Sequence, residues 1–322
     1  MKKISKKILA ALLVSAVSCS IFAGCTPAET TTAPDAQPSQ AASPATPTAA
    51  PAAEAPAASS FNTASEISVV SREDGSGTRG AFIELFGVEV KGEDGTKKDM
   101  TTKEATIANK TDVMLSTVAN NPYAVGYVSI GSLSSSVKAV PIEGVIPTSA
   151  NVKNGSYIIS RPFNIAVGGA ASDLAADFIS FIMSAEGQSV VSGGYVAIDE
   201  SAAAYSGSKP SGKLVVAGSS SVSPVMEQLI EAYNAINASA TIELQTSDST
   251  AGMTAAIEGN CDIGMASRAL TDAELETLTA TEIAIDGIAL IVNNENTISD
   301  ISKEQVKSIF TGETTEWSAV IN

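Results

Sequence analysis

The sequence contains no histidine, and this absence excludes more than any other feature of its composition. Ser-His-Asp and Cys-His catalytic groups cannot be built, and neither can a metal site with a histidine ligand. Of the three cysteines, Cys19 and Cys25 fall near the amino terminus and leave Cys261 alone in the remainder of the chain, so no disulfide framework or cysteine metal site is expected. These residues therefore predict neither an enzyme nor a protein with a metal or other cofactor.

Basic residues are also scarce, with 19 Lys and Arg against 35 Asp and Glu and a formal net charge of −16. Such a balance argues against nucleic acid or anionic lipid as a partner. It does not exclude a small anion, because local hydrogen-bond donors hold a small anion regardless of the net charge.

The first 25 residues have the pattern of a secretion signal. Lysines are frequent in residues 2–7, and an apolar run of signal-peptide length follows at 8–17 before small residues lead to Cys25. The run is too short to span a membrane. It resembles a bacterial lipoprotein signal in which Cys25 carries the lipid, such as palmitate, and anchors the protein on the extracellular face of the cell membrane. The alternative is an ordinary secreted protein cleaved after an Ala-x-Ala-like site.

Residues 26–64 consist almost entirely of Ala, Pro, Thr, Ser, Glu and Gln. This composition has too little apolar bulk to form a core, so we expect an extended, disordered tether. The rest of the chain, to residue 322, is long enough for one two-lobed protein or two small domains.

A stretch rich in glycine and hydroxyl groups follows the first predicted strand. Residues 71–79 read Ser-Arg-Glu-Asp-Gly-Ser-Gly-Thr-Arg, between apolar residues typical of a strand and a helix-like apolar spacing at 81–86. A strand that turns through Gly and Ser into a helix exposes N–H groups and hydroxyls at the positive end of the helix dipole. Arg72 can offer a bidentate fork to an oxyanion, and Asp74 is expected to hold that fork. The alternative is an ordinary capped helix.

The same arrangement recurs twice. Residues 218–224, Gly-Ser-Ser-Ser-Val-Ser-Pro, follow an apolar strand at 214–217 and precede a long amphipathic helix. Residues 247–252, Ser-Asp-Ser-Thr-Ala-Gly, follow a second predicted strand and precede a helix that reaches Ile257. Together these turns could surround a tetrahedral oxyanion with uncharged donors, although plain helix capping would also explain each of them.

Several stretches in combination are similar to the phosphate-binding proteins of ABC importers. They are residues 71–79, 124–129, 154–157, 161–163, 218–224, 261–268, 285–288 and 309–312, together with Trp317. In that family the stretch equivalent to 218–224 opens the mature protein, whereas here it follows the stretch at 71–79. The chain therefore resembles a circular permutant, and a fragment of a tandem repeat is the alternative.

The resemblance implies an α/β, two-lobed, periplasmic-binding-protein-like fold of type II that closes about a hinge. One lobe would be split, with residues 65–157 plus 288–322. The other would be continuous, with residues 158–287, and would contain a linker at 206–213 that joins ends that are free in the family.

The resemblance also implies that inorganic phosphate is bound from both lobes. The residues implied are Arg72, Ser76, Gly77 and Thr78 from the split lobe and Ser220, Ser221 and Ser249 from the continuous lobe. Arg268 stands where some relatives have an aspartate that accepts a hydrogen bond from protonated phosphate. Asp74 and Asp286 are the candidates to replace that aspartate.

The function implied is capture of phosphate outside the cell and delivery to the permease subunits of an ABC importer. We expect a monomer that contacts the membrane through its lipid only and performs no chemistry on its ligand. An enzyme acting on phosphate esters would need a metal cluster or an activated nucleophile. A surface sensor or binding module that is not coupled to transport is the remaining alternative.

Overall fold

The computed structural model describes residues 61–93 and 95–321. The predicted signal peptide, the lipidation site Cys25 and the tether up to residue 60 lie outside these residues and stay predictions. None of the described helices combines the length and the apolar character that a membrane crossing needs.

Most of the described strands form one mixed, ten-stranded sheet. Its order is β10 (Ala240–Ser247), β9 (Gly212–Ser219), β11 (Ile263–Ala266), β7 (Ser160–Gly168), β12 (Leu278–Asn293), β5 (Ala124–Ser129), β1 (Ser68–Arg72) and β4 (Thr106–Ala108). Two short strands, β6 (Val137–Val140) and β8 (Val196–Ala197), also pair with β12. A separate hairpin is formed by β2 (Glu89–Lys91) and β3 (Lys97–Asp99).

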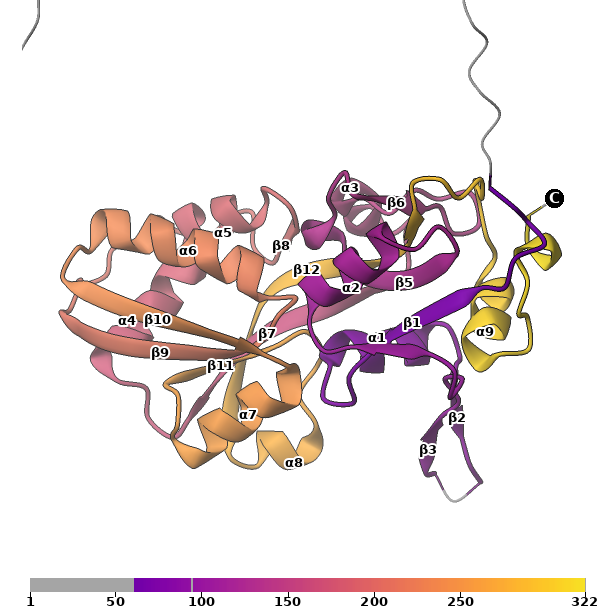
Figure 1. The fold of residues 1–322 in the computed structure, drawn as a ribbon. Coiled ribbons are helices and arrows are strands. Elements are labelled where there is room, and N and C mark those ends of the chain that lie inside the picture. The colour runs from indigo at the N-terminus through magenta and orange to yellow at the C-terminus, as the bar shows by residue number, and fades with distance from the viewer. Residues whose placement is uncertain (1–60, 94, 322) are drawn as a thin grey trace, which may run out of the picture. The chain divides into compact units, whose positions relative to one another are not determined.

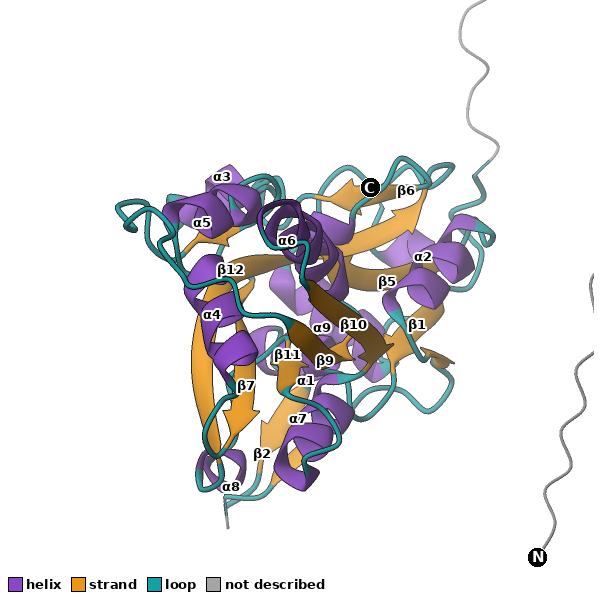
Figure 2. Ribbon diagram, turned by 90° about the vertical axis from the view of Figure 1, so that its left-hand side faces the viewer, coloured by secondary structure: helices purple, strands orange, loops and turns teal. Residues whose placement is uncertain are grey.

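Helices cover both faces of this sheet (Figures 1 and 2). They are α1 (Gly77–Leu85), α2 (Thr111–Ala119), α3 (Ser149–Lys153), α4 (Asp173–Ile182), α5 (Ala185–Val191), α6 (Ser223–Ile236), α7 (Ser249–Glu258), α8 (Asp272–Leu275) and α9 (Lys303–Thr311), with short 3-10 turns at Ile130–Ser132 and Trp317–Ala319. Figure 1 shows α6 and α7 on opposite faces of β9 and β10. The α/β class predicted from the sequence is confirmed, as is the long amphipathic helix expected after the turn at 218–224.

The longest strand, β12, connects the two sides of the sheet. Its first part, from Leu278 to Gly287, pairs with β7, and its last part, from Ile288, pairs with β5 and β6. Figure 1 shows it running from the side that holds β9 and β10 to the side that holds β5 and β1. No single apolar pattern in the sequence predicted this strand.

Buried apolar side chains gather into two large cores. The first core uses residues between 69 and 159 and again between 288 and 320, together with Val196, and it includes a stack of Phe82 on Tyr127 with ring centroids 3.9 Å apart. The second core uses residues between 163 and 284. Smaller clusters lie under α2 and under α7. Strands β7 and β12 therefore each run from one core to the other, and the short strand β8 adds Val196 to the first core.

The end of the described chain returns to its beginning. Glu66 and Glu316 form an antiparallel bridge, and the N–H of Ile67 donates to the carbonyl of Thr315 at 2.7 Å. The N–H of Trp317 donates to Ser65 at 3.2 Å. The first and last described segments of the chain are therefore neighbours in space.

The predicted linker at 206–213 has no helix or strand until β9 begins at Gly212. Asp177 on α4 fixes it, because its carboxylate accepts hydrogen bonds from the N–H of Ser208 at 2.8 Å and from the hydroxyls of Tyr205 and Tyr233. Burial acts to raise the pKa of Asp177, but these hydrogen bonds outweigh it and the pKa lies below its usual range. The carboxylate therefore stays ionised and keeps the linker on the second core.

Gly218 allows the closest backbone approach in this sheet. Its φ is +133°, and a Cβ there would lie 2.4 Å from the carbonyl oxygen of Met265. We expect Gly218→Ala to lower the free energy of unfolding by about 1–3 kcal/mol, because both the backbone angle and the contact would be strained. Gly80 in α1 is the matched control, since a Cβ there meets nothing within 4 Å. Gly80→Ala should be neutral or stabilise by up to about 1 kcal/mol. Urea denaturation measures both changes, and equal effects would contradict this account.

Candidate oxyanion-binding site

The residues of the site lie at or just after the carboxyl ends of parallel strands. Strand β1 is parallel to β4, and β9 is parallel to both β10 and β11. Arg72 ends β1, and Thr111 begins the helix that follows β4. Ser220, Ser249 and Ser267 come directly after β9, β10 and β11 or within two residues of them. Carboxyl ends of parallel strands are where ligands bind in open α/β sheets.

Arg72 is the charged group of the site and is only 2% exposed. One edge of its guanidinium is fixed, because Nε and Nη2 donate to the two carboxylate oxygens of Glu73 at 2.8 and 2.7 Å. The other edge faces hydroxyl groups, with Nη2 3.0 Å from Oγ of Ser220 and Nη1 3.4 Å from Oγ1 of Thr111. The hydroxyl of Tyr127 accepts the N–H of Arg72 at 3.1 Å, and burial raises the pKa of Tyr127 to about 12. The arginine is thus held at its backbone and along one edge of its side chain.

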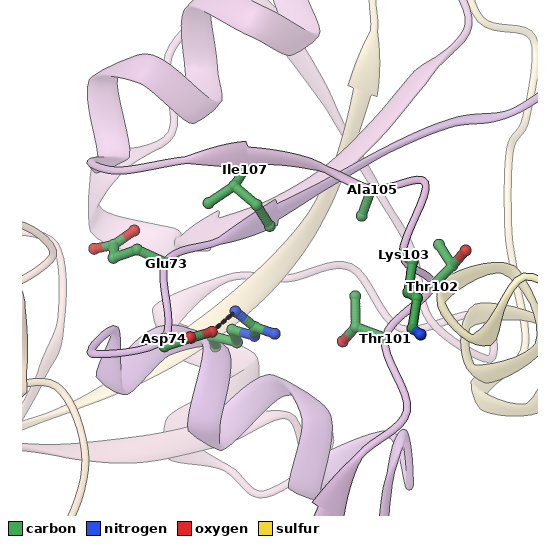
Figure 3. Close-up of a pocket in the computed structure, with 8 residues that line it drawn as sticks. Glu73, Asp74, Thr101, Thr102, Lys103, Ala105 and Ile107 are labelled. Atoms are coloured by element: carbon green, nitrogen blue, oxygen red, sulfur yellow. Dashed lines mark hydrogen bonds and ion pairs between the residues drawn. The ribbon is translucent and has the colours of Figure 1, made fainter.

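The prediction that Asp74 orients Arg72 is wrong. The N–H of Ser76 donates to the carbonyl of Glu73 at 3.0 Å, and the resulting turn places Asp74 at its tip. The Asp74 side chain is 95% exposed and pairs with Arg79. Asp74, Thr101 and Thr102 line a pocket of about 430 Å³. Figure 3 shows the carboxylate of Glu73 pointing away from these residues.

The hydroxyl groups predicted for the two sides meet. Oγ1 of Thr78 lies 2.8 Å from Oγ of Ser221, and both residues are at most 1% exposed. Oγ of Ser249 accepts the N–H of Ser267 at 3.0 Å and lies 3.3 Å from its hydroxyl. A Cβ at Gly77 would be 2.5 Å from Oγ of Ser249, so no larger residue fits there.

Ser76 is the predicted site residue with the weakest link to the other side. It is 4% exposed, and its hydroxyl caps α1 by accepting the N–H of Arg79 at 3.3 Å. The neighbouring residue Gly75 does contact the other side of the site, since its carbonyl accepts the N–H of Thr250 at 3.2 Å. The structure therefore places Ser76 beside the cluster in a capping role.

Three residues of this region were missed by the sequence analysis: Glu73, Thr111 and Ser267. Glu73 and Ser267 lie inside motifs that the sequence comparison quoted, and only their neighbours were assigned roles. Thr111 is 3% exposed and begins α2, where the cap residue Lys110 makes no side-chain capping bond. The available signal was a threonine at the start of a helix, after a short strand that lacks an apolar run.

Arg268 and Asp286 each form an ion pair with another side chain. The guanidinium of Arg268 binds both carboxylate oxygens of Glu274 at 2.7 and 2.8 Å. Asp286 is 1% exposed and accepts hydrogen bonds from Ser129 at 2.8 Å and from Arg161 at 3.1 Å. Burial raises the pKa of Asp286 despite its pairing with Arg161.

The assignment of Asp74 or Asp286 as the carboxylate that accepts a proton from the ligand is not supported by this geometry. Asp74 is exposed on Arg79, and both oxygens of Asp286 are used by Ser129 and Arg161. Asp286 nevertheless supports the site, because Nη1 of Arg161 donates to the carbonyl of Ser267 at 3.0 Å.

The arrangement offers N–H groups, hydroxyls and one guanidinium, converging from both cores. Helices α1, α2 and α7 begin at Gly77, Thr111 and Ser249, so the positive ends of their dipoles lie at the cluster. Within residues 61–93 and 95–321, no group of three His, Cys, Asp or Glu gathers as a metal site would require. Such a set of donors suits a small tetrahedral oxyanion.

Known proteins are similar to this chain over most of its length. The profile of the PBP superfamily domain matches residues 54–186 and 203–322. A protein named phosphate-binding protein PstS 2 from Streptococcus agalactiae serotype V is 53% identical over 263 residues, which cover 81% of this chain and 89% of the relative. Its namesake from Streptococcus pneumoniae serotype 4 is 46% identical over 266 residues, with 82% and 91% covered.

A solved structure agrees with the fold. The crystal structure of a phosphate ABC transporter, phosphate-binding protein from Streptococcus pneumoniae TIGR4 superimposes with a TM-score of 0.63. The sequence identity is 46%, and the match covers 79% of this chain and 99% of that chain. The two-lobed binding-protein fold predicted from the sequence is confirmed at the level of fold class.

The buried pair between Arg161 and Asp286 should matter for stability. Asp286→Asn leaves the guanidinium of Arg161 buried without its counter-charge, so we expect the free energy of unfolding to fall by about 3–5 kcal/mol. Glu200→Gln is the matched control, because Glu200 is 66% exposed in its pair with Lys153 and should contribute less than about 1 kcal/mol. Denaturant titration of both variants tests this, and a loss in Asp286→Asn no larger than in Glu200→Gln would refute it.

Proposed function

Because this chain belongs to the PBP superfamily and, within it, to the phosphate-binding proteins of ABC transporters, we propose that it binds inorganic phosphate outside the cell and delivers it to an ABC importer. The relatives named above are binding proteins, and this chain is one as well, with no enzyme activity. The observation that carries the proposal is the hydroxyl cluster that meets the free edge of Arg72.

We propose that phosphate occupies the space now bridged by hydroxyl-to-hydroxyl contacts. Arg72, Gly77 and Thr78 would contact it from one side, and Ser220, Ser221 and Ser249 from the other. Ser and Thr hydroxyls both donate and accept, so they can serve the charged oxygens and the protonated oxygen of hydrogen phosphate. Sulfate carries no proton at neutral pH and uses only the donating capacity of these groups.

Opening and closing of two lobes would admit the ligand. The lobe boundaries proposed from the sequence are 65–157 plus 288–322 and 158–287. Their support is the division into two cores, since residues between 69 and 159 and between 288 and 320 gather in one and residues between 163 and 284 in the other, with Val196 as the exception. The hinge would lie where Ser160 pairs with Gly287.

The permuted order of the chain also remains a proposal. It is supported by the contact between residues 65–67 and 315–317 and by the linker at 206–213, which Asp177 fastens to the second core. The alignment with the Streptococcus agalactiae relative spans 263 residues, which indicates that this relative has the same order of segments.

Attachment to the cell surface would come from lipid on Cys25, with the permease subunits as protein partners and a monomeric binding protein. Mutation of Cys25→Ser should release the protein into the culture medium, because no other anchor is predicted. Cell fractionation with immunodetection measures this, and Cys19→Ser serves as the matched control that should stay attached. Unchanged attachment of Cys25→Ser would contradict the lipid anchor.

Isothermal titration with phosphate, alone and in competition with sulfate, tests the function. We expect tight binding of phosphate and weaker binding of sulfate. Arg72→Ala should abolish phosphate binding, because the ligand would lose the buried guanidinium that faces Ser220 and Thr111. Asp74→Asn is the matched neighbour and should bind as tightly as the unaltered protein, since its exposed side chain pairs with Arg79.

Equal or stronger heat from sulfate would contradict the phosphate assignment and favour a general oxyanion site. Undiminished binding in Arg72→Ala would place the ligand elsewhere.

A further inference from the structure

Thr111 is, like Ser267, a buried polar residue of the cluster that neither the sequence nor the family resemblance assigned to phosphate, and it contacts Arg72. It is 3% exposed and comes from the turn between β4 and α2, a part of the chain separate from the predicted motifs. We infer that Thr111 is a ligand-binding residue of the proposed phosphate site and that its side-chain hydroxyl and backbone N–H both contact the anion. The inference rests on the proposed function.

The position of Thr111 follows from the orientation of Arg72. Glu73 occupies the Nε and Nη2 edge of the guanidinium, so an anion can approach only the edge formed by Nη1 and Nη2. On that edge Nη1 lies 3.4 Å from Oγ1 of Thr111. A phosphate oxygen that binds Nη1 must therefore lie next to the threonine hydroxyl.

More hydrogen-bond donors point at the Ser220 hydroxyl oxygen, next to Thr111, than a neutral oxygen needs. Oγ of Ser220 receives Nη2 of Arg72 at 3.0 Å and the N–H of Thr111 at 3.3 Å, and it lies 3.2 Å from Oγ1 of Thr111. Oγ of Ser221 is 3.4 Å from the same threonine oxygen. A guanidinium and a backbone N–H directed at one oxygen atom form a stronger site for an anionic oxygen than for a hydroxyl.

Packing alone does not account for a threonine here. The residue sits at the first position of α2, and Val would fill the same volume without burying a hydroxyl. The apolar packing of α2 is made further along the helix by Met114 and Val118, which are fully buried. The hydroxyl of Thr111 is turned toward Arg72, Ser220 and Ser221 instead.

The test compares substitutions that separate the hydroxyl from the methyl group, with phosphate titrated calorimetrically into the full-length protein. Thr111→Val keeps the shape and removes the hydroxyl, so the affinity should fall by about tenfold or more. Thr111→Ser keeps the hydroxyl and should retain the affinity within about threefold. Thr117→Val, further along the same helix where the hydroxyl bonds the Val113 carbonyl, should bind normally.

Thermal melts without ligand show whether each variant folds. If Thr111→Val does not fold, Thr111→Ala against Thr111→Ser isolates the hydroxyl, and the Ala variant should bind about tenfold more weakly than the Ser variant. Equal affinity in the hydroxyl-containing and hydroxyl-lacking variants would overturn the inference while leaving the phosphate site intact. A lack of phosphate binding by the unaltered protein would instead overturn the proposed function and, with it, this role for Thr111.

Discussion

A buried guanidinium is costly unless each of its edges is paired, and the site of this protein is arranged around that requirement. Arg72 is 2% exposed, and Glu73 neutralises it along one edge. Because Glu73 takes that edge, the remaining N–H groups point at hydroxyls from β9 and α2 rather than at another carboxylate. The result is a positively charged edge surrounded by neutral groups that can donate hydrogen bonds, as capture of an anion requires in a protein with a net charge of −16.

The second constraint is the continuity of the sheet between the two cores. Strand β12 pairs with β7 on one side and with β5 on the other, so the two halves of the site are joined by backbone hydrogen bonds rather than by a flexible linker. The buried pair between Arg161 and Asp286 lies at this crossing, and Arg161 also holds the carbonyl of Ser267. Through Arg161, the hydroxyl cluster therefore contacts the two strands, β7 and β12, about which the lobes would move.

Local sequence predicted those parts of the site that depend on local geometry. A Gly/Ser turn between a strand and a helix exposes N–H groups wherever it occurs, so the sequence alone singles out Gly77, Thr78, Ser220, Ser221 and Ser249 as candidates. The choice between Glu73 and Asp74 depends on one turn hydrogen bond, from Ser76 to Glu73, that the residue types do not reveal. The wrong carboxylate was therefore predicted, although a carboxylate beside Arg72 was rightly expected.

The unpredicted elements depend on contacts distant in sequence. Thr111 follows β4, an edge strand whose Thr106 and Ile107 are exposed and which therefore lacks the apolar run of a buried strand. Strand β12 is exposed or half-buried from Thr279 to Glu282 and buried from Asp286 onward, so no single periodicity describes it. Its partners lie more than a hundred residues away for most of its length, and only the folded sheet identifies them.

A crystal structure of the protein grown with phosphate tests the central claim most directly. The account predicts one tetrahedral anion bound by the Nη1 and Nη2 edge of Arg72, with Thr78 and Ser221 now bridged by the anion instead of by their direct contact at 2.8 Å. Glu73 should keep its two hydrogen bonds to Arg72. An anion found in the pocket beside Asp74, or a Thr78–Ser221 contact that persists when phosphate is bound, would contradict it.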